Sequence, residues 1–145
     1  MKEYNNIKPK FAYEFFAAIE KSDDKVLALK QFGANPPLSF LLPMNFDSRV
    51  VFDLPPGMPP YNRNNKDHPD LYAPLSSGIR RVMLCLASDR RQARWKKEQV
   101  FIQMLEGVNT KEADILILAK DRQLQTMYPW LTAEVVKEAF PTYVN

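Results

Sequence analysis

The residues of this chain best suited to chemistry are a run of cations around one tryptophan. In chain order the cations are Arg80, Arg81, Arg90, Arg91, Arg94, Lys96 and Lys97. Guanidinium and ammonium groups bind phosphate and carboxylate oxygens, and Trp95 in their midst could stack on a base or a guanidinium. A tryptophan in such a helix is more often a core anchor. The pattern predicts that these cations and Trp95 form a face for nucleic acid or for an acidic protein surface.

Most of these cations are expected at the start of one long helix, which Asp89 would cap and Gly107 would end. Arg90, Arg94 and Lys97 would then share an arc of about 60° on one face. Because a helix N-terminus carries partial positive charge, each cation there costs roughly 0.3–1 kcal/mol. An anionic partner would offset this cost, and the hypothesis fails if the chain's own carboxylates pair with these side chains. The alternative is a solvated face whose aliphatic stems cover apolar surface.

No combination of residues in the sequence is typical of a catalytic or metal centre. The lone cysteine, Cys85, stands in an apolar run and is expected in the core. The lone histidine, His68, stands in a polar loop, and a zinc site would need more imidazole or thiolate ligands. The acidic pairs have helix-surface spacing with no base beside them: Glu112 with Asp114, and Glu134 with Glu138. We therefore expect a protein that is not an enzyme and has no cofactor or metal.

Composition indicates one folded domain with a local excess of positive charge. The 145 residues match the common size of a domain, and 46% hydrophobic with 26% charged residues is ordinary for a globular chain. The net charge is +3, but ten Lys and Arg against four Asp between residues 49 and 97 give that segment +6. Since neither a leader peptide nor an apolar run of about 18 residues is recognisable, we expect no membrane partner and a cytoplasmic location.

Apolar periodicity predicts a mainly α fold, a compact single-domain bundle of about six helices over residues 1–145. A stripe of apolar residues predicts a helix over 11–22. One of the aspartates at 23–24 would cap the next helix, and Gly33 would end it with left-handed backbone. A short buried helix after two prolines would stop at Pro43, because proline disrupts a helix interior.

The second half of the chain is also expected to be helical. Residues 110–120 are apolar around most of the helix circumference, which is typical of a central core helix. Thr132 would cap the last helix. The only β-like run is 50–52, so at most one short β segment is expected. The ends, 1–10 and 141–145, are expected to vary.

A Pro-rich loop is expected over residues 54–70. Four prolines within six residues fix the backbone and favour an ordered, extended strap, which Met58 and Tyr61 would pin to the core. Long irregular loops in compact domains are often functional. The candidate partner-interface residues of the strap are Pro55, Pro56, Met58, Pro59, Pro60 and Tyr61.

Four collinear segments carry a family resemblance: residues 52–61, 90–107, 111–122 and 131–140. They read FDLPPGMPPY, RRQ onward to FIQMLEG, KEAD onward to KDR, and LTAEVVKEAF. Together, over residues 38–140, they resemble a family of small proteins encoded by T-even-like tailed phages, notably those of marine and cyanobacterial hosts. The resemblance implies a phage origin and a host-cytoplasm setting. That family has no assigned activity, so no catalytic residue is implied.

Three functions from different classes fit these features. The first is a non-enzymatic accessory protein that docks its basic helix on nucleic acid or on a nucleoprotein machine, such as the polymerase, replisome or ribosome, during infection. The second is a virion component, such as a decoration or neck protein, that uses the strap and the chain ends in an oligomer or virion assembly. The third is an inhibitor that binds an acidic host protein.

Overall fold

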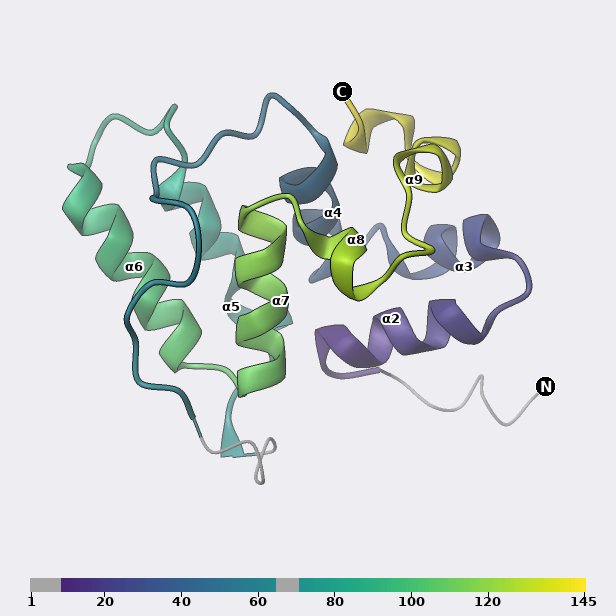
Figure 1. Ribbon diagram of the computed structural model, residues 1–145, viewed down its shortest axis with the longest axis horizontal. Helices are drawn as coiled ribbons and strands as arrows, with labels where there is room; N and C mark the ends of the chain where they lie inside the picture. The colour runs from purple at the N-terminus through teal and green to yellow at the C-terminus, as the bar shows by residue number, and fades with distance from the viewer. Residues whose placement is uncertain (1–8, 65–70) are drawn as a thin grey trace.

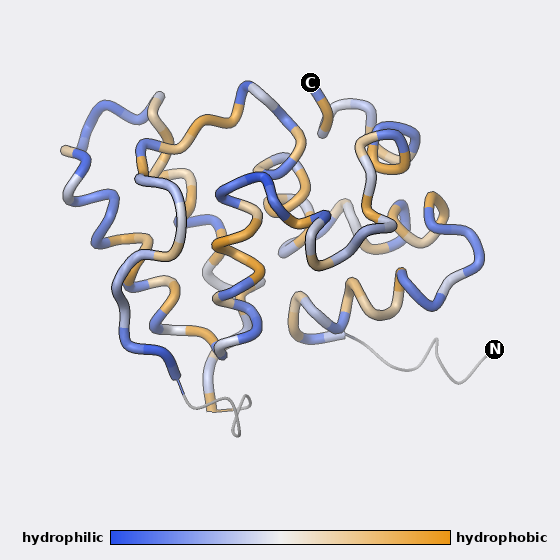
Figure 2. Tube along the Cα trace, viewed as in Figure 1, coloured by the Kyte–Doolittle hydropathy of each residue, from blue (hydrophilic) through white to orange (hydrophobic). Residues whose placement is uncertain are grey.

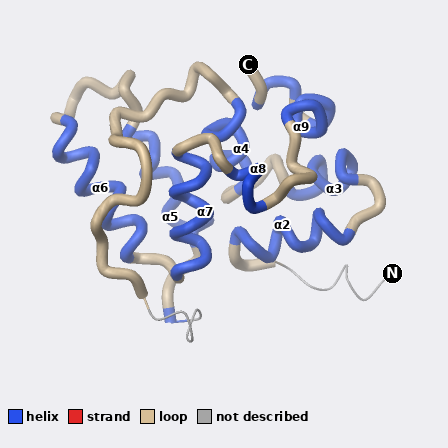
Figure 3. Tube along the Cα trace, viewed as in Figure 1, coloured by secondary structure: helices blue, strands red, loops and turns tan. Residues whose placement is uncertain are grey.

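The structure is a computed structural model that describes residues 9–64 and 71–145. The described residues form helices joined by loops, and no strand occurs among them (Figure 3). The expected mainly α fold is confirmed. Most of the N-terminal end and the last part of the 54–70 loop, including His68, lie outside the described residues.

The helices pack around α7, which lies at the centre of Figure 1 with α6 on one side and α2, α3 and α9 on the other. In chain order the elements are α2 (Ala12–Lys21), α3 (Lys25–Phe32), α4 (Leu38–Phe46), α5 (Leu75–Gly78), the 3₁₀ helix η2 (Ile79–Cys85), α6 (Arg94–Glu106), α7 (Thr110–Lys120), α8 (Leu124–Met127), α9 (Ala133–Ala139) and the 3₁₀ helix η3 (Pro141–Tyr143).

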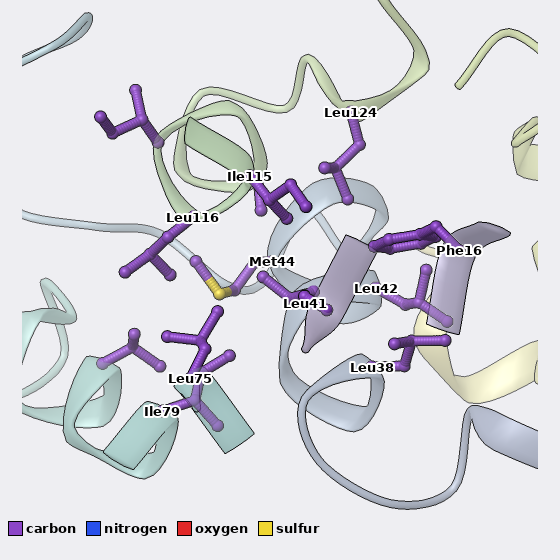
Figure 4. Close-up of a cluster of buried hydrophobic side chains, with 14 of the residues drawn as sticks. Phe16, Leu38, Leu41, Leu42, Met44, Leu75, Ile79, Ile115, Leu116 and Leu124 are labelled. Atoms are coloured by element: carbon purple, nitrogen blue, oxygen red, sulfur yellow. The ribbon is translucent and has the colours of Figure 1, made fainter. Parts of the chain in front are cut away.

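The core forms where α7 meets α4 and α2. Ile115 and Leu116 of α7 are almost completely buried, and the close-up in Figure 4 places them beside Met44 of α4. Phe16 of α2 lies at the other end of the same cluster (Figure 4). The middle of α7 is hydrophobic, whereas both of its ends are hydrophilic (Figure 2). The prediction of a central core helix over residues 110–120 is therefore confirmed.

One carboxylate holds the starts of two other helices against α7. Glu112, expected on the helix surface, is in fact 0% exposed. Its Oε2 accepts a hydrogen bond from Ala12 N at 2.7 Å, and its Oε1 accepts one from Leu75 N at 2.9 Å. Ala12 and Leu75 begin α2 and α5, and the preceding residues, Phe11 and Pro74, make no side-chain cap. Glu112 therefore supplies from α7 the acceptor for the first helical N–H of both α2 and α5.

Three further helices are each capped by the side chain of the residue that precedes them. Asp24, Asn109 and Thr132 cap α3, α7 and α9, and each accepts from the backbone N–H three residues further on, at 3.1, 2.9 and 3.2 Å. The caps expected at residues 23–24 and at Thr132 are confirmed. The cap at Asn109 also fixes the backbone N–H of Glu112, so it orients the first turn that carries the buried carboxylate.

Two predicted helix ends are wrong. Pro43 lies inside α4 rather than after it, because burial of Leu42 and Met44 in the core outweighs the backbone hydrogen bond that proline cannot make. Gly33 ends α3 with a φ of −81°, so its backbone is not left-handed. Glycine is required there by close approach, since a Cβ would overlap the ring of Phe140.

The only β pairing in the described residues is an isolated antiparallel bridge between Phe52 and Leu86. It is formed by hydrogen bonds from Asp53 N to Cys85 O at 2.9 Å and from Ala87 N to Val51 O at 2.8 Å. The expectation of at most one short β segment at residues 50–52 is therefore confirmed. This bridge brings the chain before the strap next to the segment that leads into α6.

We expect replacement of Glu112 by glutamine to lower the free energy of unfolding by about 2 kcal/mol. The amide keeps one acceptor and turns its N–H₂ toward a backbone donor, so one buried N–H is left without a partner. Urea unfolding of Glu112→Gln measures the loss. The matched control is Glu138→Gln, which changes an exposed glutamate of α9 and should stay within about 0.5 kcal/mol of wild type. Equal stability of the two variants would contradict the capping role.

The stability deficit of Glu112→Gln should also depend on pH. Burial raises the pKa of Glu112 above its ordinary value of 4.5. The native chain then keeps this proton at pH values where the unfolded chain has lost it, so its unfolding free energy falls as pH rises from 4.5 through the raised pKa. Glutamine does not titrate, so the deficit should shrink as pH rises through that interval. Unfolding series for both proteins, from about pH 4 to pH 7, test the sign.

Candidate nucleic-acid interface

The cations near residue 90 lie at the outer edge of the molecule, where a loop leads into α6 (Figure 1). The helix begins at Arg94, so the predicted start at Asp89 is wrong. Asp89 instead binds Arg91, accepting from its backbone N at 3.0 Å and from its Nη2 at 2.8 Å. An aspartate bonded to the backbone two residues on forms a turn that competes with helix. Arg90 and Arg91 therefore stand in the loop before α6.

Lys97 does not face the solvent. It is 2% exposed, and its Nζ donates to Leu86 O at 2.8 Å and to Asp53 Oδ2 at 3.3 Å. Both partners belong to the bridged segments around Phe52 and Leu86. The prediction that Lys97 projects outward with Arg90 and Arg94 is therefore wrong, because this ammonium group ties α6 to the bridge.

Arg94 is held only loosely by its carboxylate neighbours. Its Nε is 3.7 Å from Asp53 Oδ1 and 3.7 Å from Glu98 Oε2, and 55% of the side chain is exposed. Ion pairs of this length at a surface contribute little to stability. Arg94 therefore keeps most of its capacity to bind an external anion.

The premise that no carboxylate of this chain pairs with the cations is wrong for three of them. Asp53 and Asp89 engage Lys97 and Arg91, and Asp53 is also the nearest acid to Arg94 together with Glu98. Arg90 and Arg91 precede α6, so the unfavourable interaction with the helix dipole that was expected for them does not apply. What remains is a smaller exposed group, without the large uncompensated charge that the sequence predicts.

The exposed group, called the α6 surface below, consists of Arg90, Arg91, Arg94, Trp95 and Lys96. Trp95 is 58% exposed, so its expected role as a core anchor is wrong. Lys96 Nζ lies 5.5 Å from the centre of the indole ring. In the described part of the chain, neither Arg90 nor Lys96 has a carboxylate within salt-bridge distance. The α6 surface thus combines an exposed aromatic ring with cations of three kinds: Arg91 is paired with Asp89, Arg94 is loosely paired, and Arg90 and Lys96 have no carboxylate partner among the described residues.

The start of α6 adds to the positive potential of this surface. The residue before the helix, Ala93, has no side chain that can cap it, and the first turn contains no acidic residue. The backbone N–H groups of such a first turn lack helical partners and carry partial positive charge. The α6 surface is therefore an environment that favours anions.

Arg80 and Arg81 are not brought into the α6 surface. They lie on η2, where Arg81 Nη2 donates to Gln103 Oε1 at 3.1 Å and the Arg80 guanidinium lies 5.4 Å from the ring centre of Phe40. Gln103 is nine residues after Arg94, which is roughly 13 Å along the helix axis. Arg80 and Arg81 form a separate exposed pair toward the other end of α6.

The Pro-rich strap lies between α6 and α7 (Figure 1). Lys120 Nζ donates to Pro55 O at 2.9 Å, and Gly57 N donates to Asp121 Oδ2 at 2.9 Å. Further on, Arg63 forms an ion pair with Asp114 at 2.9 Å. These anchors confirm the prediction of an ordered strap for residues 54–64, the part of it that the structure describes.

The partner-interface residues predicted on the strap differ in their exposure. Tyr61 is partly buried and packs against the core, as expected. Met58 is 58% exposed, so the prediction that it pins the strap is wrong, because hydrogen bonds at Pro55 and Gly57 before it and at Asn62 after it fix the backbone. Pro55, Pro56 and Pro60 are exposed, and Pro59 is partly so. Their role at an interface stays a prediction.

Cys85 has the properties of a core residue. It is 0% exposed, and burial raises the pKa of its thiol to about 11. Its Sγ lies 3.5 Å from Lys97 O, where α6 packs against the Phe52–Leu86 bridge. In residues 9–64 and 71–145, no cluster of three His, Cys, Asp or Glu side chains could hold a metal ion. None of the helices described is both long and apolar enough to cross a bilayer.

Sequence reasoning passed over Arg122, which follows α7 and lines an open pocket with the segment before the strap. Its φ of 61° makes it the only non-glycine residue with positive φ in the described part of the chain. The available signal was the end of an apolar helix at Lys120 with no glycine after it, where glycine is the usual residue.

Comparisons with known proteins give one match. The model of a family of unknown function (DUF6433) matches residues 15–126. Neither a curated protein nor a solved structure matches the chain.

Substitution by methionine should cost far more stability at Lys97 than at its neighbour Lys96. Lys97→Met leaves Leu86 O and Asp53 without their donor, and we expect a loss of about 3 kcal/mol in unfolding free energy. Lys96→Met removes an exposed charge and should change stability by about 0.5 kcal/mol or less. Thermal and urea unfolding of the pair measure the difference. If the two variants were equally stable, Lys97 would have no structural role.

Proposed function

The chain belongs to a family of unknown function (DUF6433), and we propose that it is a non-enzymatic binding protein that docks the α6 surface on nucleic acid or a nucleoprotein machine. A polymerase, a replisome and a ribosome are machines of this kind. The resemblance of residues 38–140 to proteins of T-even-like tailed phages supports the setting. We propose that the chain is phage-encoded and acts in the host cytoplasm during infection.

The observation that carries this proposal is the exposure of Trp95 among cations. The indole ring is 58% exposed, and the side chains of Arg91 and Arg94 beside it are 78% and 55% exposed. A ring left in water forgoes the free energy that burial of its large apolar area would give. Stacking of a base on such a ring contributes about 1–3 kcal/mol, and neighbouring cations bind the phosphates.

The absence of catalytic residues is also part of the proposal. The thiol of Cys85 is buried and its raised pKa keeps it protonated near neutral pH. Glu112, the most deeply buried acid described, has both oxygens occupied by backbone N–H groups. Neither group is available to a substrate, which supports binding rather than catalysis.

A virion component is the second candidate, and the strap favours it. The polar anchors of the strap hold Met58 outward with 58% of its surface exposed, as an assembly contact would require. Mass spectrometry of purified particles tests this candidate: many copies per particle support it and none removes it. Binding to an acidic host protein is the third, and capture from host lysate that survives nuclease treatment would favour it over nucleic acid.

Removal of two cations from the α6 surface should weaken nucleic-acid binding in a salt-dependent way. In the double variant Arg90→Gln with Lys96→Gln, the slope of log affinity against log salt should decrease by about two, since each cation contacts one phosphate. Fluorescence anisotropy with labelled single-stranded and duplex oligonucleotides at several salt concentrations measures it. Trp95→Ala should weaken binding of the single strand more than that of the duplex, because only unpaired bases stack freely.

The matched control removes the same charge from the opposite side of the molecule. Lys30 on α3 and Lys137 on α9 are exposed, and both helices lie far from α6 in Figure 1. The double variant Lys30→Gln with Lys137→Gln should keep the wild-type slope. Absence of binding at low salt, or an affinity that does not fall as salt rises, would rule out nucleic acid as the partner.

A further inference from the structure

A second site lies where the segment before the strap passes the end of α7. An open pocket of about 380 Å³ is lined on one side by Val50, Phe52 and Leu54, and on the other by Lys120, Asp121 and Arg122. None of these six residues belongs to the α6 surface.

Arg122 occupies a backbone position where its side chain is a disadvantage. It has a φ of 61°, and it ends α7 in a Schellman motif, with hydrogen bonds from Arg122 N to Ala119 O at 3.1 Å and from Gln123 N to Leu118 O at 2.8 Å. Glycine is the usual residue at this position, and a long side chain such as that of arginine costs about 1 kcal/mol or more there. A strained residue of this kind points to a use for its side chain.

The guanidinium of Arg122 is the unmatched cation of the pocket. Its Nη2 donates to the backbone carbonyl of Val50, but no carboxylate of the described residues lies within salt-bridge distance of it. Lys120, by contrast, is matched by Asp121 at 2.6 Å. The charge of Arg122 helps to lower the pKa of Asp47, but the carboxylate of Asp47 forms its ion pair with Arg49, at 2.9 Å. The pocket therefore offers one guanidinium for an added carboxylate.

The wall opposite Arg122 offers free backbone groups. In the bridge with Leu86, the hydrogen bonds are made by Val51 O and Asp53 N, so the N–H and C=O of Phe52 point to the other side. No hydrogen bond in the described residues uses either group of Phe52. The carbonyl of Val50, two residues earlier, faces the same side, because it is the one that Arg122 reaches. This edge can accept one more extended chain.

We propose that the pocket binds an extended peptide segment of a partner protein. The backbone of the peptide pairs with the N–H and C=O of Phe52 as a third extended segment beside the Phe52–Leu86 bridge. A carboxylate of the peptide, from an acidic side chain or the chain end, pairs with Arg122. Val50 and Leu54 provide apolar surface for alternate side chains of the peptide.

The position of Arg122 allows binding to be separated from folding. Arg122→Gly and Arg122→Asn both remove the charge and place residues that adopt positive φ readily. The strain relieved by either change offsets the lost hydrogen bond to Val50, so both variants should unfold within about 0.5 kcal/mol of wild type. Two variants with different side chains protect the test against an individual folding defect.

The probe is a library of random peptides displayed with free carboxyl ends and selected on the full-length protein. Enriched peptides should share an acidic residue or a fixed distance to the chain end. Loss of that carboxylate, or Arg122→Asn, should weaken binding about tenfold or more, as expected for a charge-assisted hydrogen bond. Methylation of the peptide nitrogen that pairs with Phe52 should have a similar effect, and the Phe52 amide proton should exchange more slowly in the complex.

The controls keep this proposal apart from the function of the α6 surface. The double variant Arg90→Gln with Lys96→Gln should bind the selected peptides as wild type does, whatever its affinity for oligonucleotides. Failure to enrich any peptide, equal affinity of Arg122→Asn, or unchanged exchange at Phe52 would each overturn the proposal.

Discussion

Three helices of this protein, α2, α5 and α7, are tied together by one buried carboxylate. Glu112 accepts backbone hydrogen bonds from the first residues of α2 and α5, and the residues before these helices, Phe11 and Pro74, have no side chain that caps them. A carboxylate at 0% exposure is tolerated because both oxygens are occupied by donors at positively polarised helix starts. Because α7 also lies at the centre of the core, the hydrogen bonds to Glu112 set where α2 and α5 begin along α7. A second polar contact, between Lys97 and Asp53, ties α6 to the Phe52–Leu86 bridge.

The sequence predicts those parts of the fold that depend on neighbours along the chain. Helix α2 has its apolar stripe, the caps at Asp24 and Thr132 lie three residues before their donors, and the apolar circumference of α7 indicates its central position. Predictions failed where the deciding partner is distant in sequence. Glu112 meets Ala12 across 100 positions and Lys97 meets Asp53 across 44, so both read locally as exposed charges. At Pro43 the local rule was correct as a tendency, but tertiary burial outweighed it.

The candidate site was predicted in its location but not in its composition. The density of arginines around residue 90 indicates a basic surface, and Arg90, Arg91, Arg94 and Lys96 are exposed. The Asp89 side chain could either cap a helix or accept from the backbone N–H two residues later, and the sequence is compatible with both. The structure shows the second, a turn. Trp95 was predicted on the basic face, with a core anchor as the more common role for such a residue, and its position in the first turn of α6 leaves it exposed. No sequence motif indicates Arg122, because the feature that distinguishes it is its positive φ angle.

The bridge segment, residues 50–53, lies between the α6 surface and the pocket at Arg122. Asp53 contacts Lys97 and Arg94 beside the α6 surface, while Phe52, the adjacent residue, lines the pocket at Arg122. Any occupant that shifts this short segment on one side also alters the contacts on the other. Thermodynamic linkage makes such an effect mutual: whatever factor the first ligand imposes on the affinity of the second, the second imposes on the first. If both surfaces bind the partners proposed for them, the consecutive residues Phe52 and Asp53 are the place where one binding event would affect the other.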